Sequence, residues 1–106
     1  MKITSTPWGR PDNVEIIADG IAFVSTPSHG GFVLSAERAA KIPAVAKPYA
    51  GDRRYWEEDG DWAVPYVVFN AEMAGWSSAK YNGPTKMMRY ARGALKFAGL
   101  TVEDLT

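Results

Sequence analysis

The sequence predicts an α+β fold in which a small antiparallel β-meander packs against two or three helices, the last of them amphipathic and basic. Three observations lead to this prediction. Two segments rich in β-branched residues, 13–18 and 21–25, flank an Asp-Gly pair. A third extended segment follows at residues 32–34. Apolar residues then recur with helical spacing over residues 84–98.

The composition is typical of one globular domain spanning residues 1–106. Of the 106 residues, 46% are hydrophobic and 23% charged, which is enough to bury a core without disulfides. The absence of cysteine excludes a disulfide framework, a thiol nucleophile and a cysteine-based zinc site. Twelve basic residues balance twelve acidic ones, so any electrostatic role must be local.

The cellular location follows from what the sequence lacks. The N-terminal segment has no apolar stretch of the kind found in secretion signals. The longest apolar run, residues 63–69, is far shorter than the roughly 20 residues of a membrane helix. We therefore expect a cytoplasmic protein that does not contact the membrane. No cofactor-binding motif is present, and no cofactor is expected.

The first two strands should form a hairpin, because Asp19-Gly20 tolerates positive φ at both turn positions. After this hairpin, Pro27 and the glycine pair at 30–31 are expected to stop regular pairing before the third strand begins. The prediction is a three-stranded meander with a structured loop at one end.

A short helix is predicted over residues 36–42. Ser35 is a good N-cap, and Pro43 ends the helix. The prolines and glycine of residues 43–54 then indicate an irregular connection.

Residues 55–69 allow two interpretations. A helix can begin near Asp61, since Pro65 would lie in the first turn and cost no backbone hydrogen bond. An edge strand is the alternative, because the apolar residues that follow are strand formers. We favour the helix. For residues 70–83 the pattern leaves helix and loop equally open.

The last helix is predicted over residues 84–98, with Pro84 in its first turn and Gly99 just past its end. One face is apolar and consists of Met87, Ala91, Ala94, Leu95 and Ala98. The basic residues lie largely on the other side, at Lys86, Arg89, Arg92 and Lys96.

Charges are segregated along the chain. Residues 52–61 contain five acidic and two basic side chains, whereas residues 80–96 contain five basic side chains and no acidic one. The two segments can pair with each other or remain solvated faces, as surface charges usually do. Alternatively, each can contact a partner.

Residues His29, Gly30 and Gly31 form a candidate functional loop. His29 is the only histidine, and its imidazole can act as a general base or bind a partner. In the structural interpretation, the glycines supply positive φ for a tight turn and His29 fastens that turn to the fold.

The acidic block at residues 57–61 is a second candidate. Together with His29, its carboxylates could form an acid–base pair or an oxygen-rich metal site, but their spacing does not match a calcium loop. We expect no metal, and we interpret the block as a contact surface. Trp56 is expected to join that surface, whereas Trp62, next to the apolar run, is expected in the core.

Three segments carry a family resemblance: Thr-Pro-Trp-Gly at residues 6–9, Ser-Thr-Pro-Ser-His-Gly-Gly at 25–31, and Tyr-Trp-Glu-Glu-Asp with a following Trp-Ala at 55–63. Their order and spacing resemble a family of bacteriophage and mobile-element proteins whose shared domain has no known function. The resemblance covers residues 6–69, so the basic helix is expected to be peculiar to this chain.

The resemblance implies a small cytoplasmic product of a phage, plasmid or integrated element, with no activity or catalytic residue to transfer. Many such products are non-enzymatic inhibitors of host defence, including anti-CRISPR proteins. This association comes from genomic context and not from a site.

The leading hypothesis is a small non-enzymatic protein that binds another protein, such as a component of a bacterial defence complex. One predicted contact patch contains Trp56, Glu57, Glu58 and Asp59, and the other contains Arg89, Arg92 and Lys96. The first alternative is a nucleic-acid-binding module that uses the basic helix, although the isoelectric point of about 6.6 is low for such proteins. The second is a small hydrolase centred on His29 and the acidic block.

Overall fold

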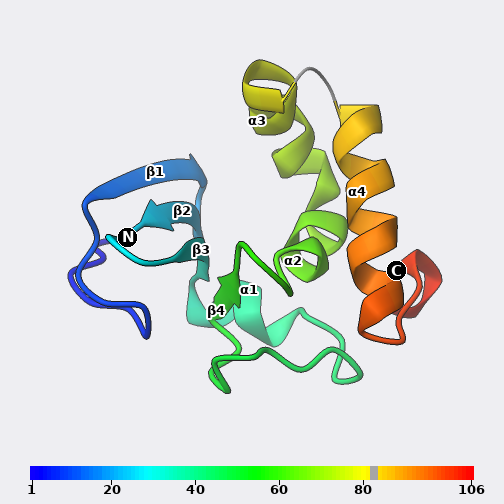
Figure 1. The fold of residues 1–106 in the computed structure, drawn as a ribbon, viewed down its shortest axis with the longest axis horizontal. Helices are drawn as coiled ribbons and strands as arrows, with labels where there is room; N and C mark the ends of the chain where they lie inside the picture. Colours follow the sequence, from blue (N-terminus) through cyan, green and yellow to red (C-terminus); the bar gives the residue numbers. More distant parts are fainter. Residues whose placement is uncertain (82–83) are drawn as a thin grey trace.

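The computed structural model describes residues 1–81 and 84–106, with a sheet on one side and the larger helices on the other (Figure 1). The sheet is antiparallel with strand order β1-β2-β3-β4. Its strands are β1 (Asn13–Ala18), β2 (Ile21–Ser25), β3 (Gly30–Leu34) and β4 (Tyr55–Glu57). The helices are α1 (Ala36–Ala40), α2 (Ala63–Val68), α3 (Asn70–Tyr81) and α4 (Pro84–Phe97), followed by the 3-10 helix η1 (Val102–Leu105). The predicted α+β class is confirmed.

The hairpin between β1 and β2 is confirmed with the predicted bounds. Gly20 in its turn has a φ of +81°, the left-handed conformation that favours glycine. Its carbonyl accepts a hydrogen bond from the N–H of Ser35 at 2.9 Å, which ties the turn to the start of α1. The next strand, β3, runs antiparallel to β2 and places Phe32 opposite Phe23.

The prediction for the glycine pair is wrong. Gly30 and Gly31 belong to β3, pair with Ser25 and Val24 of β2, and do not have positive φ. The intervening loop is short, and the N–H of Thr26 closes it by donating to the His29 carbonyl at 2.7 Å. Glycine is required for space. A Cβ at Gly30 would lie 2.5 Å from the Val24 carbonyl oxygen, and one at Gly31 would lie 2.2 Å from that of Trp56.

Strand β4 was not predicted, and it makes the sheet four-stranded. It pairs with β3 so that Trp56 lies opposite Phe32. Trp56 is 0% exposed, and its indole N–H donates to the Arg53 carbonyl at 2.7 Å. The predicted surface role of Trp56 is therefore wrong. Trp62, predicted to be in the core, is only partly buried and packs against the core cluster.

The short helices largely follow the sequence. The Ser35 hydroxyl accepts from the Arg38 N–H at 3.2 Å, as expected of an N-cap, and α1 ends two residues before the predicted boundary. Residues 43–54 form an irregular connection, as predicted. Helix α2 begins at Ala63 with Pro65 in its first turn, so the helical interpretation is confirmed. In the undecided segment, residues 70–81 form α3, and residues 82–83 lie outside the described part of the chain.

Helix α4 ends in a Schellman motif at Gly99, whose φ is +74°. Its N–H donates to the Lys96 carbonyl at 3.1 Å, and the N–H of Leu100 donates to the Leu95 carbonyl at 2.9 Å. Ala91 and Leu95 of the predicted apolar face are buried. Ala98, predicted on the same face, is exposed because the helix has already ended.

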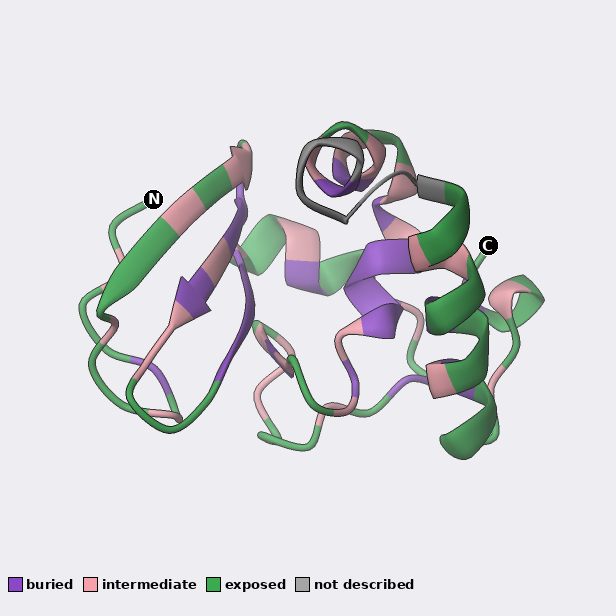
Figure 2. Cartoon of the chain, turned by 45° about the horizontal axis from the view of Figure 1, so that its top comes forward, coloured by how far each residue is buried: buried purple, intermediate pink, exposed green. Residues whose placement is uncertain are grey.

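The core lies between the inner strands and the helices (Figure 2). Phe23, Phe32 and Trp76 join the two layers, and their ring centroids are 5.3–5.7 Å apart. An ion pair between Arg38 of α1 and Glu72 of α3 adds a second link. Within residues 1–81 and 84–106, no helix has the length and apolar character needed to cross a bilayer.

Replacing Gly31 with alanine tests the close approach of β3 and β4. The added Cβ would press on the Trp56 carbonyl, so we expect Gly31→Ala to lower the free energy of unfolding by about 1–3 kcal/mol. Gly93→Ala in α4 is a matched control with open space around the added Cβ. We expect this control to stabilise the protein by about 0.5–1 kcal/mol. Urea unfolding of both variants measures the difference, and an equal effect would contradict the steric explanation.

Candidate functional site

The acidic loop, residues 57–61, connects β4 to α2 and is held in place by Asp61. This carboxylate is only 7% exposed and accepts main-chain hydrogen bonds from Tyr49 at 2.6 Å and Glu57 at 2.5 Å. The N–H of Trp62 also donates to the Glu57 carbonyl, at 3.0 Å. Burial raises the pKa of Asp61, although the two main-chain donors oppose this shift. Asp61 is therefore a structural member of the acidic block, because its carboxylate oxygens are used to hold the main chain.

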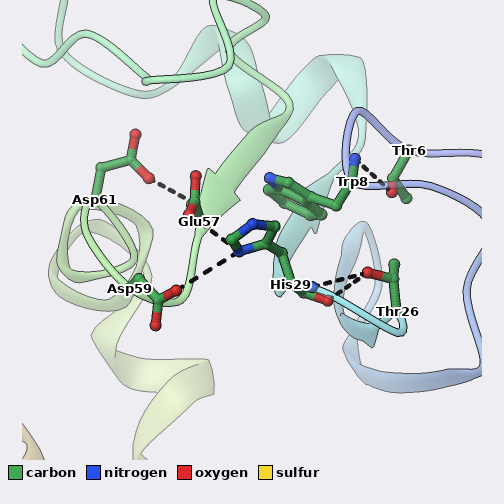
Figure 3. A network of polar contacts seen from close by, with 7 residues as sticks. All are labelled: Thr6, Trp8, Thr26, His29, Glu57, Asp59 and Asp61. Atoms are coloured by element: carbon green, nitrogen blue, oxygen red, sulfur yellow. Dashed lines mark hydrogen bonds and ion pairs between the residues drawn. The ribbon is translucent and has the colours of Figure 1, made fainter.

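His29 lies against the acidic loop in Figure 3. Its Nδ1 atom is 3.5 Å from a Glu57 carboxylate oxygen and 3.6 Å from one of Asp59. Strand pairing explains this arrangement, because the N–H of Glu58 donates to the Gly30 carbonyl at 2.9 Å and so places the loop before β3 beside the loop after β4. The structure thus brings together the two candidate sites that the sequence had placed far apart.

The His29 cluster, consisting of His29, Glu57 and Asp59, is open to solvent. The His29 side chain is 47% exposed, and the three residues offer ligand atoms within 4.8 Å of one another. Such a set can hold a divalent cation weakly or remain a solvated ion-pair group. The hydrolase alternative gains little from it. The neighbouring Thr26 hydroxyl donates to the His29 carbonyl at 2.6 Å and so is not directed at the imidazole.

An aromatic pocket of about 300 Å³ is lined by residues of β2, β3, the acidic loop, α3 and α4. Trp76 of α3 forms part of its wall, and its indole N–H donates to the Glu15 carboxylate of β1 at 2.9 Å. Together, the residues lining the pocket are Phe23, Phe32, Glu58, Asp59, Trp62, Trp76 and Met87.

Sequence reasoning missed this pocket. Its wall needs Phe23 and Phe32 side by side, which follows only when the loop between β2 and β3 is limited to residues 26–29. It also needs α3 to be a helix, and that segment had been left open. The spacing of the two phenylalanines around a four-residue connection was the available signal.

The basic face of α4 consists of Arg89, Arg92 and Lys96, all exposed. In the part of the chain that the structure describes, no ion pair joins this face to the acidic loop. Arg54 instead pairs with Asp52 at 2.8 Å, and this hydrogen-bonded pair lowers the pKa of Asp52. The two charged segments therefore do not neutralise each other among the described residues.

Substituting Asp61 by asparagine tests its structural role. The amide group faces one of the two main-chain donors with its own N–H, so we expect the free energy of unfolding to fall by about 1–3 kcal/mol. Because burial raises the pKa of Asp61, its contribution to wild-type stability is full below the pKa of an unfolded aspartate and declines as pH rises through the folded value. Urea unfolding at a series of pH values should show the free energy of unfolding of the wild type falling relative to that of Asp61→Asn as pH rises through this range. Parallel pH profiles would contradict it.

Comparison with known proteins identifies a family for this chain. Residues 1–96 match the domain family described as "Domain of unknown function (DUF7007)". The match includes α3 and most of α4, so the expectation that the likeness ends at residue 69 and that the basic helix is peculiar to this chain is wrong. No curated protein and no solved structure matches the chain. The chain belongs to the DUF7007 family.

Proposed function

We propose that this protein acts by binding another protein, without catalysing a reaction, through two charged surfaces. One is the acidic loop, and the other is the basic face of α4. The supporting observation is that both surfaces are exposed and that no ion pair between them is found among the described residues. Opposite charges that are not paired with each other among the described residues are available to steer and orient a partner.

On the acidic side, the contact residues of the proposal are Glu57, Glu58 and Asp59. Glu58 and Asp59 are exposed, and Glu57 is partly exposed beside His29. Trp56 leaves the proposed contact set because it is buried. Its buried side chain anchors β4 in the core and so holds Glu57, the first residue of the acidic loop, in place.

On the basic side, Arg89, Arg92 and Lys96 are accompanied by exposed aromatic rings. Phe97 is 97% exposed and Tyr90 is 55% exposed. Arginine and aromatic residues are enriched at protein–protein interfaces, where the rings supply buried apolar area. A fully exposed phenylalanine next to these cations favours a protein partner over nucleic acid.

A narrower form of the proposal assigns the protein to a phage or mobile element, acting in the host cytoplasm as an inhibitor of a defence system such as an anti-CRISPR. Its support is the resemblance carried by residues 6–9, 25–31 and 55–63. The charged surfaces agree with it in one respect, because an inhibitor of this kind needs a contact surface and no catalytic centre.

Nucleic acid is the second candidate, and the exposed cations of α4 favour it. Phosphate contacts from Arg89, Arg92 and Lys96 would release counterions and make the affinity strongly dependent on salt. The balanced total charge of the chain argues against a dedicated nucleic-acid binder.

Charge reversal of the acidic loop tests the leading proposal. The immobilised wild type is expected to capture specific proteins from a bacterial lysate. We expect Glu58→Lys/Asp59→Lys to reduce the captured amount of these proteins by about tenfold or more. Glu37→Lys/Glu103→Lys is the matched control, because it reverses two exposed acids, one in α1 after the end of β3 opposite to the loop and one in η1. Mass spectrometry quantifies the captured proteins, and cooperative unfolding verifies each fold. The same captured set with all three proteins would contradict the role of the loop.

A salt titration tests the nucleic-acid alternative. If α4 contacts phosphates, the logarithm of the affinity for duplex DNA falls with the logarithm of salt with a slope of about −0.9 per contact. In the variant Arg89→Ala/Arg92→Ala/Lys96→Ala, the magnitude of this slope should then fall by nearly three times the value for one contact. Fluorescence anisotropy at several salt concentrations measures the affinities. A flat salt response in the wild type rules out this alternative.

A further inference from the structure

The His29 cluster combines one nitrogen ligand atom with two carboxylates. The imidazole Nδ1 and one oxygen from each of Glu57 and Asp59 all lie within 4.8 Å of one another. Figure 3 shows the His29 side chain directed at both carboxylates of the acidic loop. In the part of the chain that the structure describes, neither carboxylate forms an ion pair with a lysine or an arginine. Among these residues, the two negative charges are therefore not balanced by a permanent cation.

The separations within the cluster are those of ligands around one metal ion, and they are too long for hydrogen bonds. The His29 Nδ1 atom lies 3.5 Å from the Glu57 oxygen and 3.6 Å from the Asp59 oxygen. A hydrogen bond from N–H to oxygen normally spans about 2.7–3.2 Å. In a tetrahedral site with metal–ligand bonds of about 2.0–2.2 Å, neighbouring ligand atoms are about 3.3–3.6 Å apart. An ion can therefore contact all three side chains after a small rotation of Asp59, whose side chain is 72% exposed.

Main-chain hydrogen bonds hold two of the three ligands in this arrangement. The Thr26 hydroxyl accepts from the His29 N–H at 3.1 Å and donates to the His29 carbonyl at 2.6 Å. The Glu57 N–H donates to the buried Asp61 carboxylate at 2.5 Å, and Glu57 lies opposite Gly31 in the pairing of β3 with β4. The backbone positions of His29 and Glu57 are therefore fixed before an ion arrives, which lowers the entropic cost of binding.

The ligand atoms determine the class of ion. Carboxylates suit Mg²⁺, Ca²⁺ and Mn²⁺, whereas imidazole suits zinc, copper, iron and nickel. Ca²⁺ takes about six to eight oxygen ligands, which two carboxylates and a nitrogen do not supply. Two carboxylates with one imidazole, and room for water as a further ligand, suit Zn²⁺ or a similar transition-metal ion.

We propose that His29, through Nδ1, and the carboxylates of Glu57 and Asp59 bind one divalent transition-metal ion of the zinc class. Three protein ligands leave a coordination position for water, because the cluster is open to solvent. The sequence predicts no metal, since only the pairing of β3 with β4 brings the histidine and the acidic loop together. The site goes beyond the proposed protein-binding function and is tested on the isolated protein, without a partner.

Titration with ZnCl₂ and CaCl₂ tests this proposal. The protein is prepared without an affinity tag, so that His29 remains its only histidine. Among the described residues no second group of this kind is found, so calorimetry should give saturable one-to-one binding of Zn²⁺. We expect Ca²⁺ to bind more weakly by about tenfold or more. The ¹⁵N NMR signals of the imidazole identify the ligating atom, and we expect Nδ1 to shift more than Nε2.

Single substitutions separate ligation from the general attraction of an acidic surface. His29→Ala, Glu57→Gln and Asp59→Asn should each raise the Kd of Zn²⁺ by about tenfold or more, because each removes one ligand. The matched control is Glu58→Gln, which removes a charge from the same loop but no member of the cluster. We expect this control to change the Kd by about threefold or less, since it alters only a screened charge. Cooperative urea unfolding of each variant verifies its fold.

Any of three results would overturn the metal site. The first is the absence of saturable Zn²⁺ binding. The second is an equal Kd for His29→Ala and the wild type, which would show that carboxylates alone attract the ion. The third is binding of Ca²⁺ as tight as that of Zn²⁺, which would indicate an oxygen-only site. Lysate capture that depends on the acidic loop would stand after any of these results, so the two proposals fail independently.

Discussion

Contact between Trp76 of α3 and the phenylalanines of β2 and β3 is the interaction on which the rest of the structure depends. It joins the helical layer to the sheet, which Figure 1 shows on two sides of the molecule. The indole hydrogen bond to Glu15 extends this link to β1. Arg38 adds a second attachment, since its guanidinium pairs with Glu72 and lies 4.9 Å from the Phe69 ring centroid. In both attachments, a polar group with a directional hydrogen bond or ion pair lies beside an aromatic ring. These contacts therefore orient the helices relative to the sheet in addition to stabilising their packing.

The acidic loop has its position because β3 and β4 approach closely. Gly31 allows the Trp56 carbonyl to come within a distance that any side chain would prevent. Trp56 then fills the space beneath β4, and Asp61 closes the loop by accepting two main-chain hydrogen bonds. The exposed carboxylates are thus displayed by a buried scaffold of a tryptophan, a glycine and an inward-facing aspartate. Their positions are set by packing, as a preorganised contact surface requires.

The function that this geometry supports depends on surfaces more than on reactive groups. His29 gains two carboxylate neighbours, but the Thr26 hydroxyl is already engaged in a hydrogen bond to the His29 carbonyl. In contrast, the acidic loop connects an exposed charged patch to a preformed aromatic pocket. The basic face of α4 carries a different composition, with arginines beside exposed rings. Two chemically distinct surfaces on one small body are consistent with a partner that is contacted at more than one point.

The sequence by itself determined the features that rest on neighbouring residues. Asp19-Gly20 defined the hairpin, Ser35 the start of α1, and Gly99 the end of α4, because turn and cap chemistry acts over a few positions along the chain. Only the tertiary structure decided β4, the burial of Trp56 and the aromatic pocket. A strand of three residues has no periodicity to detect, and a tryptophan's environment depends on residues far away in sequence. The glycine pair was misread for the same reason, since the atoms that forbid a side chain there belong to other strands.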